Sequence, residues 1–361
     1  YGRHMDAVYD QFARRFSRYS SRLAGATENG RGGLMPLYLF RTQDEYLGFL
    51  ASHGIAAEGS GGLFFITHAV QGLATWTDGH PRAQTFRTLQ HEGFHQFAWH
   101  HLGPHLPTWM NEGLAQYFED AVLLDHGMEL GLGHPRRIAR VREALDTRSA
   151  LPMEELIALG SRQWSQAVRT NASRSELLYA QSWSVVYFLI HGDDARYLRP
   201  FEVYLRLLSD GEAHAEAFRT AFGVGALGAI EDRWRTHALA QRPDPVAEAA
   251  ARLEFLGAAI AHQHAHGEAM PRHLRALRQD LRARGFRLTR THHGVEEVFD
   301  ARDEAVFTYT RPGGERSDFL LLEPSALGLP PRLVAPGLSP EPNLVWEFRP
   351  DGTIAHEIEF R

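Results

Sequence analysis

The sequence predicts an α+β protein with two domains, and three observations support this prediction. Apolar side chains recur at helical spacing between residues 85 and 240, whereas residues 37–40 and 61–76 hold short β-rich runs. Two prolines in the polar run Gln241-Arg-Pro-Asp-Pro-Val cannot continue a helix, so a domain boundary is expected there. Helical patterns and then alternating β segments follow this boundary. We therefore expect a larger domain over residues 1–240 and a small α+β domain, of open role, over residues 245–361.

A small N-terminal sheet is expected to precede the helical region. The stretch Gly61 to Trp76 holds two β-rich apolar runs, which we expect to be separate strands divided at Gln71-Gly72. Before it we expect a helix over residues 7–23, a glycine-rich turn at Gly30, Gly32 and Gly33, and a strand over residues 37–40.

Two helices are predicted next. The first starts near Thr85 and ends at Gly103-Pro104, and the second runs from Thr108 to about Leu124. Further helices are expected over residues 174–191, 197–208, 212–222 and 226–240. The C-terminal domain should contain helices over residues 247–265 and 271–284, strands over residues 286–291, 305–309 and 319–322, and a closing hairpin, residues 345–348 and 354–360, around Pro350-Asp351-Gly352.

Composition narrows the function. The hydrophobic share of 43% with 23% charged residues is ordinary for a globular protein, and no stretch predicts a membrane span. A formal charge of −6 gives no support to nucleic-acid binding. Because the chain has no cysteine, any transition-metal site must use His, Asp and Glu. The compartment stays open: the start has no signal-peptide pattern, and a secreted or periplasmic location is expected only if such a peptide has been removed, with a cytoplasmic one otherwise.

The most informative motif is His91-Glu92-Gly93-Phe94-His95, an H-E-x-x-H pattern within a predicted helix. Residues four apart on a helix are separated by about 40° of rotation, so both imidazoles can reach one metal ion. A carboxylate beside them can take the proton of a metal-bound water. The motif alone is weak evidence for a metal site, because a chain with 21 histidines produces such spacings by accident. A third ligand is therefore needed to support the prediction.

Two downstream residues compete for the third ligand position. His101 stands where the pattern H-E-x-x-H-x-x-G-x-x-H would place a third histidine, but the turn glycine of that pattern is Ala98 here. If the helix continues through Ala98, His101 is rotated away from the metal. His101 is then better interpreted as a polar residue near the end of the helix. Glu112, on the next predicted helix, can complete a three-ligand site and leave the fourth position open for water.

The run Pro107-Thr-Trp-Met-Asn-Glu-Gly-Leu-Ala-Gln-Tyr117 resembles the second-helix motif of gluzincin zinc metallopeptidases, most closely the peptidase-MA-like proteins. Together with H-E-x-x-H, the resemblance covers roughly residues 60–240. It implies a gluzincin-like catalytic domain, one Zn²⁺ per chain held by His91, His95 and Glu112, and Glu92 as general base and acid. Tyr179 matches the position of the family tyrosine that stabilises the oxyanion of the tetrahedral intermediate. Packing of Tyr179 against Trp183 is an equal alternative.

Several departures from the family pattern matter. No G-x-M-E-N motif precedes the predicted zinc helix, which weakens an aminopeptidase assignment. The position one turn after Glu112, where thermolysin-like relatives place an aspartate, is Gln116. Glu119 is left open as either an acceptor behind a histidine or a solvated residue.

The run Leu73-Ala74-Thr75-Trp76 stands where gluzincins place an edge strand that pairs with substrate. We expect either this substrate-binding role or an internal strand at these residues.

The leading expectation is zinc-dependent hydrolysis of a peptide bond in a peptide or protein substrate, with Glu92 activating the water. Two alternatives remain: a non-catalytic zinc-binding recognition protein, and a zinc hydrolase that acts on a non-peptide amide. Retention of Glu92 argues against the first alternative, because a structural zinc ion does not need a general base.

Overall fold

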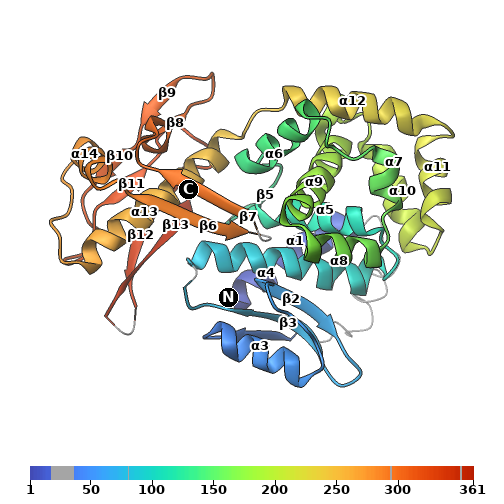
Figure 1. The fold of residues 1–361 in the computed structure, drawn as a ribbon, viewed down its shortest axis with the longest axis horizontal. Coiled ribbons are helices and arrows are strands. Elements are labelled where there is room, and N and C mark those ends of the chain that lie inside the picture. The colour runs from blue at the N-terminus through green and yellow to red at the C-terminus, as the bar shows by residue number, and fades with distance from the viewer. Residues whose placement is uncertain (18–35, 80, 293–294, 350–351) are drawn as a thin grey trace. The chain divides into compact units, whose positions relative to one another are not determined.

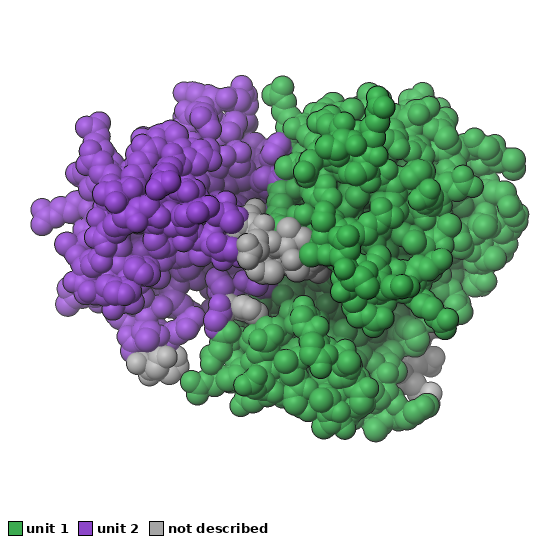
Figure 2. Space-filling view, in the orientation of Figure 1, with its two compact units in different colours: residues 1–78, 85–131, 136–242 green, residues 79–84, 132–135, 243–361 purple. Residues whose placement is uncertain are grey.

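The computed structural model describes residues 1–17, 36–79, 81–292, 295–349 and 352–361. The chain forms two compact units (Figure 2). Unit 1 holds residues 1–78, 85–131 and 136–242, and unit 2 holds residues 79–84, 132–135 and 243–361. The last passage between them falls between Arg242 and Pro243, within the proline-containing run. Helices and strands occur in both units, so the protein is of the α+β class.

Unit 1 contains a three-stranded sheet with the order β1-β3-β2 (Figure 1). The central strand β3 (Gln71–Trp76) pairs in parallel with β1 (Leu37–Phe40) and antiparallel with β2 (Gly62–Ile66). The helix expected over residues 7–23 begins earlier, as α1 (Gly2–Phe16). Its predicted end and the turn at Gly30, Gly32 and Gly33 lie outside the described residues.

The turn between β2 and β3 is not at Gln71-Gly72, and both residues belong to β3. Thr67 closes the connection instead. Its N–H and its hydroxyl each donate to the Val70 carbonyl at 2.8 Å, and Val70 N–H donates to Thr67 Oγ1 at 2.9 Å. The turn therefore comes before Gln71, which lengthens β3 by two residues relative to the prediction.

Helices cover both faces of this sheet, because successive side chains of a strand point to opposite faces. On one face, Phe65 and Trp76 pack with Tyr46 of α3 (Gln43–Ser52) in a small apolar cluster. On the other face, Leu73 joins the main core together with Phe94 of α4 (Arg82–Phe97). The H-E-x-x-H helix thus lies directly on the sheet (Figure 1).

Helix α4 ends in a π-helical turn, η1 (Ala98–Leu102). Gly103 N–H donates to the Ala98 carbonyl five residues back, at 2.9 Å. Gly103 has a φ of 99°, a backbone conformation that favours glycine, so the helix stops where Gly103-Pro104 predicted.

Helix α5 (Thr108–Glu119) is shorter than predicted and is followed by a hairpin of β4 (Val122–Leu124) and β5 (Gly127–Glu129). The cause is the buried amide of Gln90 on α4. Its Nε2 donates to the carbonyls of Phe118, Glu119 and Ala121, at 2.8, 3.2 and 3.0 Å. These bonds satisfy carbonyls that a longer helix would have used, so the chain leaves the helix at Glu119.

Helix α5 packs closely on α9 (Ala172–Ala195) because residue 113 is glycine. A Cβ at Gly113 would lie 2.6 Å from the Ser182 carbonyl oxygen and 2.7 Å from Val186 Cγ2. The remaining helices of this region are α6 (Pro135–Asp146), α7 (Met153–Ala158), α8 (Ser161–Thr170), α10 (Leu198–Ser209), α11 (His214–Phe222) and α12 (Ala226–Ala240).

Unit 2 packs α13 (Pro245–Ala265) on an antiparallel sheet with the order β10-β11-β12-β13. Asp244 caps α13 by accepting Val246 N–H at 2.8 Å, which explains why the helix starts at a proline. The sheet consists of β10 (Leu320–Leu322), β11 (Arg332–Val334), β12 (Pro342–Phe348) and β13 (Ile354–Phe360). The last two form the predicted hairpin, whose residues Pro350 and Asp351 lie outside the described residues.

The other elements of unit 2 are α14 (Leu274–Arg284), β6 (Arg287–His292), β7 (Val295–Asp300), η2 (Glu304–Phe307), β8 (Thr308–Thr310) and β9 (Arg316–Asp318). The strand expected over residues 305–309 is wrong in its first half. Asp303 accepts Ala305 N–H at 2.9 Å and starts a short 3-10 helix, so the strand begins only at Thr308.

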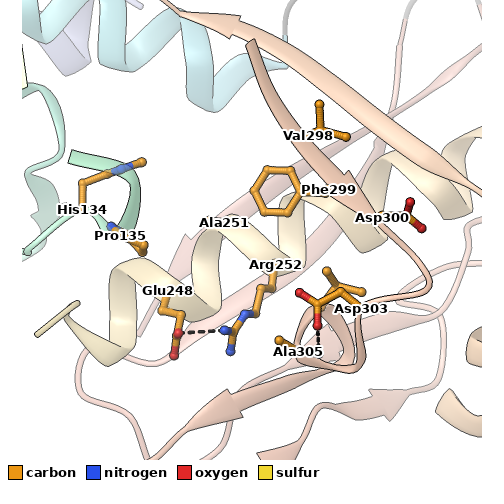
Figure 3. Close-up of a pocket in the computed structure, with 11 residues that line it drawn as sticks. His134, Pro135, Glu248, Ala251, Arg252, Val298, Phe299, Asp300, Asp303 and Ala305 are labelled. Atoms are coloured by element: carbon orange, nitrogen blue, oxygen red, sulfur yellow. Dashed lines mark hydrogen bonds and ion pairs between the residues drawn. The ribbon is translucent and has the colours of Figure 1, made fainter. Parts of the chain in front are cut away.

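Unit 2 also holds a cavity of about 280 Å³ (Figure 3). Two of its charged side chains pair with each other: Arg252 donates to Glu248 Oε1 at 2.7 Å, and it also donates to the Thr308 carbonyl at 2.9 Å. The residues that line this cavity include neither H-E-x-x-H nor Glu112. The described part of the chain contains no helix that is both long and apolar enough to cross a membrane.

Candidate metal centre

Two helices of unit 1 bring three potential metal ligands together. His91 and His95 lie one turn apart on α4, and Glu112 lies in the second turn of α5. The Nε2 atoms of His91 and His95 are each 3.5 Å from Glu112 Oε2, and the ligand atoms of all three residues lie within 4.8 Å of one another. Among the described residues, this is the His/Asp/Glu group whose geometry could hold a metal ion.

The spacing of these atoms fits a tetrahedral ion. Two ligand atoms that are each about 2.0–2.2 Å from such an ion lie roughly 3.3–3.6 Å apart, and each imidazole Nε2 is 3.5 Å from Glu112 Oε2. Glu112 Oε2 is buried and has no hydrogen-bond partner among the described residues. Burying a carboxylate oxygen without a partner is costly. The residues therefore fit a cation placed between the two imidazoles and this oxygen.

The electrostatics of the pocket favour positive charge. Burial by itself lowers the pKa of His91, but the carboxylates of Glu112 and Glu119 outweigh burial and raise that pKa to about 10. Burial would raise the pKa of Glu112, yet the adjacent His95 and His91 hold it well below its usual range. Surroundings that retain protons this strongly also favour a metal cation, which must displace those protons in order to bind.

Glu92 is held beside the cluster by the sheet. Its Oε2 accepts the Phe64 N–H of β2 at 2.8 Å. The strand can come this close because Gly62 has no side chain: a Cβ there would lie 2.5 Å from Thr88 Cγ2 and 3.4 Å from Glu92 Cγ. The backbone of β2 therefore fixes the carboxylate that the motif identifies as the general base.

The two alternatives for Leu73, Ala74, Thr75 and Trp76 are decided by the sheet order. These residues lie on β3, whose two edges are occupied by β1 and β2, so the edge-strand alternative is wrong and the internal one holds. The strand next to Glu92 is β2, which within the described residues pairs on one side only. The sequence left both alternatives open because both runs are similarly apolar, and the residue pattern of neither run determines the order of the strands.

Glu119 contacts His91 on the ring nitrogen Nδ1, which faces away from the cluster. Its Oε2 lies 3.0 Å from His91 Nδ1, and the carboxylate is only 3% exposed. With Nδ1 as the donor, this bond leaves the lone pair of Nε2 toward Glu112 and fixes the ring orientation. The sequence left Glu119 open, and the structure assigns it to the acceptor position behind His91.

Tyr179 lies on α9, within electrostatic reach of the cluster. Burial, and after it the negative charge of Glu112, raises the pKa of Tyr179 well above its usual value, so its hydroxyl stays protonated. Its ring packs edge-on against Trp164 at 5.4 Å, whereas Trp183, the expected neighbour, packs on Tyr187. A protonated phenol can donate a hydrogen bond, whereas it cannot act as a base.

Two other histidines, His101 and His191, lie away from the cluster. His101 is not part of it and instead packs against Phe97, with ring centroids 4.7 Å apart. His191 Nε2 lies 2.8 Å from the hydroxyl of Tyr117, and this hydrogen bond links α9 to α5.

Sequence reasoning missed three residues that organise the site: Phe64, Gln90 and Arg137. Phe64 contributes a backbone N–H, which no side-chain motif can reveal. Gln90 immediately precedes His91, and this position was a usable signal. Arg137 lies on a later helix, and only the fold brings it to Glu119, where its Nη2 is 3.1 Å from Oε2.

Comparison with known proteins adds a single match. The model of a family described as "Protein of unknown function (DUF1570)" matches residues 85–204. No curated protein and no solved structure matches the chain. The matched stretch contains His91, Glu92, His95, Glu112 and Tyr179, so the candidate centre lies within the part of the chain that is similar to this family, whose description names no activity.

Proposed function

We propose that this protein is a zinc-dependent peptidase with a gluzincin-type site, in which His91, His95 and Glu112 hold one ion per chain. The observation that carries the proposal is the position of Glu92. A buried three-ligand cluster alone would suit a structural ion, but here the carboxylate of a further residue, Glu92, lies beside the cluster and is held separately, by the Phe64 N–H. Three protein ligands from His and Glu with one open position are typical of catalytic rather than structural zinc.

A bound zinc ion would polarise the substrate carbonyl and make a coordinated water more acidic. Glu92 would accept a proton from the attacking water and deliver it to the leaving amine. The Phe64 N–H holds one oxygen of this carboxylate, which limits how far the general base can move between the two transfers.

The edge of β2 that no strand of the described residues covers supports an extended peptide as the substrate. Phe64 N–H points away from β3 and toward Glu92, so the alternating pattern of an antiparallel strand turns the polar backbone groups of Gly62, Phe64 and Ile66 to the same edge. A peptide that adds to β2 by backbone hydrogen bonds would bring its carbonyl next to Glu92. Tyr179 would then donate a hydrogen bond to the oxygen on which negative charge develops.

The test combines metal analysis with cleavage of a mixed peptide library by the full chain, side by side with Glu92→Gln. We expect one zinc per chain in both proteins and cleavage only in the wild type. Glu58→Gln, a change at an exposed glutamate of the same unit, is the control and should cleave normally.

Each other outcome has a defined meaning. Zinc in both proteins without cleavage of any peptide would contradict the peptidase and favour a recognition protein or an amide hydrolase with another substrate. Absence of bound metal in zinc-replete protein would overturn the metal site itself.

A further inference from the structure

We propose that Arg137 is a positioning residue of the metal centre, which strengthens metal binding by holding the Glu119 carboxylate in place behind His91. This inference rests on the proposed metal site, but it concerns a residue that no motif marks. It follows from a chain of three buried side chains, His91, Glu119 and Arg137, that leads from the candidate ligand into the core of unit 1.

The chain of contacts is continuous and shielded from solvent. His91 Nδ1 and Arg137 Nη2 both contact the same oxygen, Oε2 of Glu119, at 3.0 and 3.1 Å. The side chains are 6%, 3% and 9% exposed for His91, Glu119 and Arg137. Because water has little access to this oxygen, its partners within the protein decide where it points.

Arg137 is itself fixed by two further contacts. Its other terminal nitrogen, Nη1, donates to Asp120 Oδ2, and its guanidinium carbon lies 6.0 Å from the centre of the Trp183 ring. The two terminal nitrogens of the planar guanidinium thus bind two consecutive carboxylates, Glu119 and Asp120, at the end of α5. A lysine could not provide this fork, because its ammonium is a single point charge.

The geometry explains what Arg137 contributes. Its Nη2 contacts the same Glu119 oxygen that His91 Nδ1 contacts, and its Nη1 is anchored on Asp120, so the Glu119 carboxylate is held in one position behind the imidazole. The positive charge of Arg137 is compensated by both carboxylates. A carboxylate fixed in this way orients the ring of His91 and keeps its Nε2 toward Glu112.

The experiment measures zinc affinity by competition with a chromogenic chelator, using the full chain. Changes to residues behind a ligand typically weaken metal affinity by about 10- to 100-fold, and we expect a loss in this range for Arg137→Gln and a smaller loss for Arg137→Lys. The matched control is Arg140→Gln. Arg140 lies one turn further along α6, is 12% exposed and forms ion pairs with Glu143 and Glu176.

A double-mutant cycle separates positioning from general stability. If Arg137 acts through Glu119, Arg137→Gln combined with Glu119→Gln should bind zinc no more weakly than Glu119→Gln alone. Folding of each variant is checked by circular dichroism, and Arg137→Lys serves as the test if Arg137→Gln does not fold. Unchanged affinity in a folded Arg137 variant, or strictly additive losses, would overturn the inference. Failure of the wild type to bind zinc would instead overturn the proposed metal site.

Discussion

Tyr179 shows at the scale of one residue how surroundings decide what a side chain can do. Buried near three carboxylates, its hydroxyl is held in the protonated form and is suited to donate a hydrogen bond rather than to act as a base. We expect Tyr179→Phe to lower kcat by about 100- to 1000-fold with little change in KM, because the lost bond forms only as charge develops on the substrate. Steady-state kinetics on a peptide identified from the library check this.

Tyr117→Phe is the matched control for that prediction. It removes a hydroxyl of similar burial on the neighbouring helix, but this hydroxyl bonds His191 rather than facing the cluster. An equal loss of kcat in both variants would show that Tyr179 contributes only to packing.

A second prediction at this scale concerns Gly62. A methyl group there would press on Thr88 Cγ2 and crowd Glu92, so we expect Gly62→Ala to reduce kcat about 10- to 100-fold by displacing the general base. Gly61→Ala is the control, since its Cβ would meet nothing nearer than 4.0 Å. Adding Thr88→Ser removes the obstructing methyl group and should restore activity. Lack of rescue would contradict the steric cause.

The residues of the candidate site were largely readable from the sequence, and the reason is local. Glu92 lies between the two histidines in one helical turn, so the helix alone brings them to one face. Glu112 was inferred from the resemblance of its surroundings, and the structure brings it within 3.5 Å of both imidazoles. Arg137 could not be inferred, since its role depends on how α6 packs beside the end of α5.

At the scale of elements, the closest constraint lies between α5 and α9. Gly113 permits their contact, and a methyl group there would meet backbone atoms of Ser182, which cannot turn aside. We expect Gly113→Ala to lower the free energy of unfolding by about 1–3 kcal/mol. Gly228→Ala, in open space on α12, should instead raise it by about 0.5–1 kcal/mol. Urea denaturation monitored by circular dichroism compares the two, and stabilisation by Gly113→Ala would contradict the packing argument.

Element types were predicted better than element ends. Helices and strands with clear periodicity were found, such as β1 over residues 37–40 and α12 over residues 226–240. The ends of β3 and α5 were misplaced because side chains decide them: Thr67 closes a turn early, and Gln90 takes the last carbonyls of α5. These contacts link residues that no local pattern connects.

At the scale of the whole molecule, buried neutral histidines make stability depend on pH. Burial lowers the pKa of His356 in β13 to about 4 from 6.5. The unfolded chain then binds the proton more readily between pH 6.5 and 4, so stability is full above pH 6.5 and declines as the pH falls toward 4. We expect a loss of about 3 kcal/mol from this residue across that window.

His356→Leu should remove this part of the acid sensitivity. The Nε2 of His356 has no hydrogen-bond partner among the described residues, so leucine leaves no polar group unpaired. Urea unfolding of the full chain at pH 7, 5.5 and 4.5 compares the variant with the wild type. A pH dependence of equal slope in both would contradict the assignment.

The π-helical turn η1 limits where the chain can gain or lose residues without disturbing the candidate site. Five residues span this turn where an α-helix would use four, so removing any one of residues 98–102 could restore a regular helix at little local cost. Each residue of an α-helix turns the chain by about 100°, so Gly103 and everything after it would start in a different direction. We therefore expect insertions and deletions among related sequences to be tolerated in the loop before Thr108 and selected against within Ala98–Leu102, because a one-residue deletion there would redirect the helix that carries Glu112.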